Sequence, residues 1–135
     1  MGRALLILVD THVVVWLAFE EAQLSRKART TIEVARRNAE ALAISAITLL
    51  ELATLARKGR IHIDIGLESF LQEVETRFAV LPITGRACAR IAGLPVTYPK
   101  DPADRIIGAT ALVEGLPLLT ADRKIRRSKI VRTIW

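Results

Sequence analysis

The chain has 135 residues, of which 51% are hydrophobic and only 4% aromatic, and its formal net charge is +6. This composition excludes a disordered chain and predicts one domain over residues 1–135 with an aliphatic core. The basic balance favours polyanionic partners such as nucleic acid, although solubility alone is a sufficient reason for it.

Cysteine usage and hydropathy indicate a cytoplasmic protein without a membrane segment. Cys88 is the only cysteine, so an internal disulfide is excluded, and we expect it to be a small core residue. The apolar run at residues 5–9 is interrupted by Asp10 and is too short for a secretory signal peptide. No apolar run approaches the ~20 residues that a membrane-spanning helix needs.

The first half of the chain alternates short apolar runs with longer segments of helical character. The run at 5–9 is typical of a strand buried on both faces, and it ends in the polar triplet Asp10-Thr11-His12. The predicted elements are a strand over 5–9, a short helix over 13–19, a helix from the N-cap Ser25 to about Glu40, a strand over 42–44 and a helix over 45–56.

The second half continues this alternation. Its clearest helix has Asp101 as N-cap, Pro102 at the first helical position and Gly115 as its stop. The other predicted elements are a helix over 67–77, a strand over 79–81 with Ile83, a short helix over 84–92, a strand over 116–120 and a final or edge strand over 130–134. Strands alternating with helices predict a three-layer α/β/α fold with a mostly parallel central sheet.

Four acidic residues, Asp10, Glu51, Asp104 and Asp122, are expected at one edge of this sheet. Asp10 and Asp122 follow predicted strands, and Glu51 and Asp104 are expected in the first turns of helices that start from the same edge. Read singly, each acid is better interpreted as a helix cap or a strand end. Together, four like charges would raise one another's pKa values. A Mg²⁺ or Mn²⁺ ion removes this conflict, and two such ions can hydrolyse a phosphodiester.

The sequence around these acids resembles the PIN-domain nucleases, and within them the VapC-type toxin ribonucleases of toxin–antitoxin pairs. The matching stretches are LILVDTHVVVWL at 6–17, ISAITLLEL at 44–52, DPADRIIGATAL at 101–112 and LLTAD at 118–122. The resemblance implies a PIN-like fold in which Asp10, Glu51, Asp104 and Asp122 are the four family acids. It also implies Mg²⁺- or Mn²⁺-dependent hydrolysis of single-stranded or looped RNA, and a small antitoxin that blocks the acidic crevice.

The sequence allows more than one role for several residues next to the acids. The hydroxyls of Thr11, Ser45 and Thr120 either orient a ligand or water, or simply cap a turn. We expect Asp101 to cap its helix, with a place at the edge of the metal site as the alternative. His12 is expected to pack or to bond the backbone rather than to catalyse.

Basic residues flank two of the acids. Arg57 and Lys58 follow the Glu51 helix, while Arg123, Lys124 and Arg126 follow Asp122. They either steer RNA phosphates toward the metal site or form an ordinary solvated face. No interleaved aromatic pattern indicates base stacking.

The roles of two apolar segments are open. The leucines of 49–55 and the helix at 13–19 form either a homodimer seam, a groove for a partner segment, or core.

The main alternative to a nuclease is a non-catalytic RNA-binding or regulatory α/β module with a degenerate metal site. The presence of all four acids argues against this alternative. An Asp-x-Asp phosphatase motif is excluded because position 12 is histidine.

Overall fold

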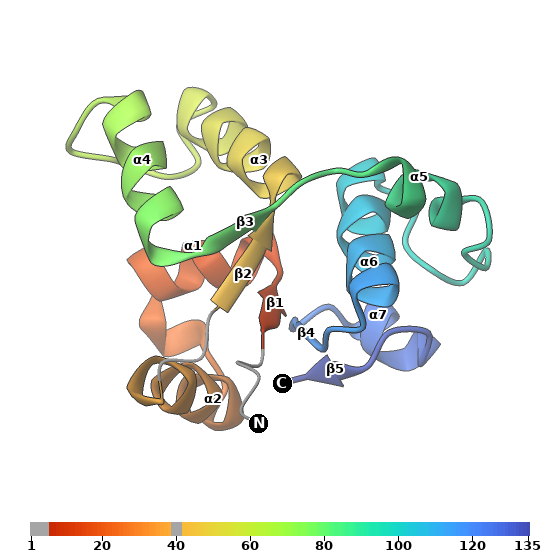
Figure 1. The fold of residues 1–135 in the computed structure, drawn as a ribbon. Helices are drawn as coiled ribbons and strands as arrows, with labels where there is room; N and C mark the ends of the chain where they lie inside the picture. Colours follow the sequence, from red (N-terminus) through yellow and green to blue (C-terminus); the bar gives the residue numbers. More distant parts are fainter. Residues whose placement is uncertain (1–5, 39–41) are drawn as a thin grey trace.

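The computed structural model describes residues 6–38 and 42–135 and builds them around a five-stranded sheet (Figure 1). The strand order is β3-β2-β1-β4-β5, and every neighbouring pair is parallel. The strands are β1 (Ile7–Val9), β2 (Leu42–Ser45), β3 (Ala79–Leu81), β4 (Leu118–Leu119) and β5 (Thr133–Ile134). The predicted parallel α/β sheet is therefore confirmed.

Helices connect the strands and cover both faces of the sheet (Figure 1). They are α1 (Thr11–Phe19), the 3-10 helix η1 (Glu21–Gln23), α2 (Arg26–Arg37), α3 (Ala46–Arg57), α4 (Leu67–Arg77), α5 (Gly85–Ile91), α6 (Pro102–Glu114) and α7 (Arg123–Ser128). Within the ranges that the structure describes, none of them is long and apolar enough to cross a lipid bilayer.

The three layers follow from the alternation of side chains along buried strands. Ile7 and Val9 point into a core that they share with α1, α2 and α4, whereas Leu8 between them points into a second core shared with α6 and α7. Both faces of β1 are therefore covered, which explains why its sequence is a continuous apolar run instead of an alternating one.

Capping residues determine where the helices begin and end. Ser25 Oγ accepts a hydrogen bond from the backbone N–H of Ala28 and begins α2, as predicted. Gly115 ends α6 with φ of +68°, a left-handed conformation that favours glycine. α1 begins at Thr11, two residues earlier than predicted, because Asp10 already serves as its N-cap.

Several predicted elements differ from the observed ones. The strands predicted over 116–120 and 130–134 shorten to the two-residue strands β4 and β5, although the hydrogen bond from Thr120 N to Ile134 O continues the pairing. Ile83 lies outside β3. Cys88 is exposed on α5, so the prediction of a core cysteine is wrong. Residue 5 of the first predicted strand, and residues 39–40 of the second predicted helix, lie outside the described residues.

The strand order reverses between β1 and β4, which are neighbours although most of the chain separates them. The chain adds β2 and β3 on one side of β1, and β4 and β5 on the other. In open parallel sheets such a reversal opens a crevice at the carboxyl ends of the strands, where ligands bind. Asp10 follows β1 and Thr120 follows β4 at this point.

Candidate metal centre

Asp10 is held almost completely buried, with 3% of its surface exposed, at the end of β1. Its Oδ1 accepts a hydrogen bond from the backbone N–H of Thr11 at 2.9 Å, and its Oδ2 accepts one from the hydroxyl of Thr120 at 2.7 Å. These two donors fix the orientation of the carboxylate. Because Thr120 directly follows the neighbouring β4, the contact joins the two sides of the crevice.

A chain of hydroxyls positions Glu51. The hydroxyl of Thr11 donates a hydrogen bond to Glu51 Oε1, and it lies 2.9 Å from the hydroxyl of the fully buried Thr48. The prediction that Glu51 lies in the first turn of α3 is wrong. Ser45 caps that helix, which places Glu51 in its second turn. Nothing in the sequence placed Thr48 at the site, because its contact with Thr11 joins residues 37 positions apart in the chain.

Asp104 lies in the first turn of α6, as predicted, and its side chain is half-buried. Asp101 occupies the N-cap position of this helix, but its side chain makes no capping hydrogen bond, so the preferred capping role is wrong. The Asp101 side chain is exposed. Its charge instead acts on the acids of the site, since it raises the pKa of both Asp104 and Glu51.

Asp122 has a structural role that the other acids do not share. Its Oδ1 accepts a hydrogen bond from the backbone N–H of Ile125 at 3.0 Å, and thereby begins α7. Its own backbone N–H donates to the hydroxyl of Thr120. The same threonine therefore orients Asp10 and the turn that carries Asp122. Ser45, by contrast, is a helix cap, as its side chain accepts the backbone N–H of Ile47.

A cleft of about 250 Å³ brings three of the acids together. Asp10, Glu51 and Asp104 all line it, while Asp122 is not among its lining residues. The remaining wall is partly polar and partly apolar, and consists of Thr11, His12, Val15, Trp16 and Leu55. The cleft therefore combines a carboxylate floor with an aromatic and aliphatic side.

The electrostatics of the cleft show that these carboxylates repel one another. Burial, together with repulsion from Asp10, Asp101, Asp122 and Glu51, raises the pKa of Asp104 from 3.8 to about 7. Burial also raises the pKa of Glu51, against the hydrogen bond from Thr11, which lowers it. Asp122 thus acts electrostatically on Asp104 even though it lies outside the cleft wall.

The chemistry of these donors fits a hard divalent cation. Across residues 6–38 and 42–135, no three acidic, histidine or cysteine side chains already stand around a single ion position. The donors are nevertheless carboxylate oxygens on a cleft where protonation of Asp104 is the alternative to a counter-charge. Mg²⁺ and Mn²⁺ prefer such oxygens and keep several waters, so they do not require a complete protein cage.

His12 ties the Asp10 side of the crevice to the turn before Asp122. Its Nε2 accepts the backbone N–H of Ala121 at 3.0 Å, which confirms the expected backbone-bonding role. In the neutral ring the proton is then on Nδ1, which faces Asp10 Oδ2 at 3.6 Å. His12 thus supports the geometry of the site from its rim.

The predicted basic residues are exposed, in two separate groups. Arg57 and Lys58 lie at the end of α3, about two turns beyond Glu51. The other three residues lie on α7, the helix that Asp122 caps: Arg123, Lys124 and Arg126. Both groups therefore extend from elements that carry an acid.

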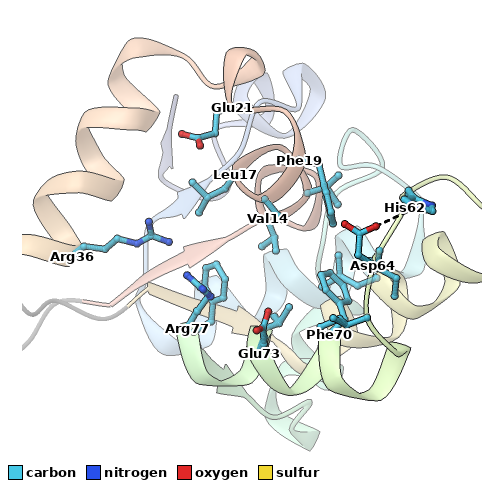
Figure 2. A pocket seen from close by; sticks show the side chains of 17 residues that line it. Val14, Leu17, Phe19, Glu21, Arg36, His62, Asp64, Phe70, Glu73 and Arg77 are labelled. Atoms are coloured by element: carbon cyan, nitrogen blue, oxygen red, sulfur yellow. Dashed lines mark ion pairs between the residues drawn. The ribbon is translucent and has the colours of Figure 1, made fainter.

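A second, larger hollow of about 500 Å³ lies between α1, α2, α4 and the segment before α4 (Figure 2). Its wall is apolar where Leu17, Phe19 and Phe70 face it, and charged groups stand around its rim. Two of these, Arg36 and Arg77, are at one end, and the ion pair of His62 with Asp64 is at the other (Figure 2). We call this hollow the α1–α4 groove.

Comparison with known proteins agrees with this architecture. The chain matches the PIN domain family over residues 7–130. It is 39% identical over 131 residues to Ribonuclease VapC22 of Mycobacterium tuberculosis, a match that covers 96% of this chain and 98% of that protein.

Solved structures with the same fold include two VapBC structures bound to DNA. VapBC2 from Rickettsia felis, bound to a DNA fragment from its promoter, superposes with a TM-score of 0.71 at 18% identity, over 96% of this chain and 97% of that one. DNA-bound VapBC from Salmonella typhimurium has the same TM-score at 23% identity, over 97% of both chains. From the match over residues 7–130 and the VapC relative, we conclude that this chain belongs to the PIN domain family.

Proposed function

We propose that this protein is a metal-dependent endoribonuclease that acts as the toxin of a toxin–antitoxin pair, with residues 1–135 as a single catalytic domain. The observation that carries the proposal is the convergence of Asp10, Glu51 and Asp104 on one cleft of a basic protein. The high identity to a ribonuclease over nearly the whole chain supports RNA as the substrate. A cytoplasmic location fits an RNA substrate.

Asp10 and Asp104 would hold the metal ion, with Asp122 as a further acid close by and Glu51 binding or positioning the attacking water. When bound, Mg²⁺ or Mn²⁺ supplies a more acidic water and a positive charge near the leaving oxygen of the phosphodiester. The chain's own contribution is to fix the carboxylates in advance. Thr120 and the backbone of Thr11 orient Asp10, and the Thr11 hydroxyl orients Glu51.

RNA phosphates would follow the basic residues at the rim. Arg57 and Lys58 on one side, and Arg123, Lys124 and Arg126 on the other, are exposed on the two helices that carry or follow acids of the site. Contacts of this kind depend strongly on salt and carry no sequence preference. Neutralising two of them should weaken RNA binding equally for all sequences.

The decisive experiment is metal-titrated cleavage of a mixed RNA pool. We expect cleavage in Mg²⁺ or Mn²⁺, none in EDTA, and recovery when Mn²⁺ is added back. Asp10→Asn should bind RNA without cutting it. Cleavage at the wild-type rate by Asp10→Asn would refute the proposal, and metal-independent RNA binding without any cleavage would favour the non-catalytic module.

The α1–α4 groove is the proposed binding site of the antitoxin. Helix α1 has its buried Asp10 cap at one end and Phe19, which is 41% exposed, at the other, so a peptide in the groove would lie next to the acidic cleft. Val15 lines both hollows, which connects them physically. Apolar walls with an arginine at the rim are typical of a groove that takes an amphipathic segment with an acidic end.

A single substitution tests this binding site. Phe19→Glu should leave RNA cleavage intact but prevent a candidate antitoxin from inhibiting it, because it puts a charge on the apolar groove wall that Phe19 and Phe70 form. Glu33→Gln on the exposed face of α2 is the matched control and should remain inhibited. Full inhibition of Phe19→Glu would place the antitoxin elsewhere.

Homodimerisation is proposed through a different face. Leu52, one of the predicted seam residues, is fully buried in the core, but Leu50 is 62% exposed beside Ile63 and Leu67. Large exposed apolar side chains in one patch mark an interface between proteins. Leu50→Lys should therefore convert a dimer to a monomer in analytical ultracentrifugation, and an unchanged mass would argue against this seam.

A further inference from the structure

The two tryptophans of this aromatic-poor chain pack against each other, and one of them, Trp16, lines the acidic cleft. Trp16 follows Asp10 on α1, and Trp135 follows the edge strand β5. Their ring centroids are 5.8 Å apart with an interplanar angle of 53°. His12 also meets Trp16 edge-on, with centroids 5.0 Å apart.

Trp16 also forms part of the cleft wall. It lines the same hollow as Asp10, Glu51 and Asp104, and its side chain is half-buried, so the rest of its surface is available there. Val15 and Leu55 complete an apolar strip next to it. An aromatic surface therefore stands directly beside the carboxylates.

The contacts around Trp16 hold it in one position. Its inner side packs against the larger core, and His12 is itself fixed by the hydrogen bond from the backbone N–H of Ala121. A ring that is ordered before binding loses little conformational entropy when a ligand stacks on it. Filling the core alone would not require a half-exposed indole on an acidic wall.

We propose that Trp16 is a stacking site for an RNA nucleobase adjacent to the scissile phosphate. This inference rests on the proposed nuclease function and adds the part of the substrate that the acids cannot bind. Unpaired bases of single strands and loops stack on aromatic side chains, whereas bases inside a duplex are not available for this contact. Stacking tolerates any base, so this contact selects for unpaired RNA without selecting a particular sequence.

The test compares two RNAs on a cleavage-deficient Asp104→Asn protein in Mg²⁺. One is a short fluorescent single-stranded RNA of mixed sequence, and the other is the same backbone without bases. In fluorescence anisotropy, adding Trp16→Leu should weaken binding of the first RNA about 5- to 150-fold. Binding of the abasic RNA should hardly change. Trp16→Phe should retain most of the affinity, because a phenyl ring still stacks.

A matched control lies one turn away on the same helix. Phe19→Leu removes an aromatic ring that faces the α1–α4 groove, and it should affect neither RNA. Equal binding of the base-containing RNA with and without Trp16→Leu would overturn the inference. An equal loss for both RNAs would do so too, because it would indicate a distorted cleft.

A spectroscopic readout keeps the inference testable if Trp16→Leu does not fold. In Trp135→Phe the indole of Trp16 is the only one left, and base-containing RNA should quench its fluorescence while the abasic RNA does not. Absence of quenching at saturating RNA overturns the inference. Cleavage by the wild-type protein is measured separately, so the stacking site and the nuclease function succeed or fail independently.

Discussion

Asp104→Asn should make the metal-free protein more stable while it abolishes cleavage. The carboxyl of Asp104 is half-buried among other acids, and its pKa is raised from 3.8 to about 7. The folded protein therefore binds this proton more tightly than the unfolded chain. Protonation of Asp104 therefore stabilises the fold. This stabilisation is complete below about pH 4 and is lost as the pH rises through 7. Asparagine has nearly the same shape as aspartate, and it stays uncharged at every pH.

The size of the effect follows from the raised pKa. A rise from 3.8 to about 7, at ~1.4 kcal/mol per pH unit, corresponds to a penalty of about 4 kcal/mol when Asp104 is fully ionised. Solvent screens part of this at a half-buried side chain. We therefore expect Asp104→Asn to raise the free energy of unfolding by about 2–4 kcal/mol at pH 8, and by under ~0.5 kcal/mol at pH 4.

Urea unfolding followed by circular dichroism measures this difference in EDTA at a series of pH values. Glu114→Gln, an exposed acid at the other end of α6, is the control and should change stability by under ~0.5 kcal/mol at every pH. Adding Mg²⁺ at pH 8 should stabilise the wild-type protein and leave Asp104→Asn nearly unchanged, since the ion replaces the missing counter-charge.

Two results would refute this reasoning. If Asp104→Asn were no more stable than wild type at pH 8 in EDTA, the carboxylates would not be in electrostatic conflict. If the gain were the same at pH 4 and pH 8, it would come from packing and not from ionisation. Either result would remove the electrostatic argument for a metal ion at this cleft.

Three further substitutions test the packing of Tyr98 against Gly108 of α6 and the positioning of Asp10 by Thr120. Tyr98→Phe should raise the unfolding free energy by about 1 kcal/mol in urea titrations, because the buried Tyr98 hydroxyl has no hydrogen-bond partner among the described residues; a loss of stability would mean that the hydroxyl is satisfied. Gly108→Ala should lower it by about 1–3 kcal/mol, since a Cβ there would lie 2.1 Å from Tyr98 Oη; unchanged stability would show that the ring moves freely. Thr120→Val should reduce cleavage about 10- to 100-fold, because it removes the hydrogen bond that orients Asp10. Cleavage is measured with Mg²⁺ at saturation, and the melting temperature is the control for folding. Wild-type activity would show that Thr120 does not position Asp10.

The local signals in the sequence were strong where a single residue type has one dominant use. Ser25 and Gly115 were identified as helix ends because a side-chain acceptor and a left-handed residue are needed there, whatever the tertiary fold. The same reasoning failed for Asp101, whose position is that of an N-cap but whose side chain makes no cap bond. A capping residue type therefore indicates a helix start more reliably than it indicates the bond.

The edge at which the acids gather was also predictable in outline. Parallel strands place their carboxyl ends together, so acids directly after strands had to approach one another. Their depth was not predictable. Glu51 lies one turn further into its helix than expected, and Asp122 lies beside the cleft wall rather than in it. These details depend on which residue caps each helix.

The sequence by itself determined the order of strands and helices, the parallel sheet and the approximate position of Asp10 and Asp104, because apolar periodicity, caps and strand ends are local properties of the chain. Only the tertiary structure decided the contacts of Thr11 with Thr48, of Thr120 with Asp10, and of Trp16 with Trp135. These pairs are distant in sequence and depend on strand order and helix packing. No local pattern encodes such an arrangement, which is why the aromatic wall of the cleft appeared only in the folded protein.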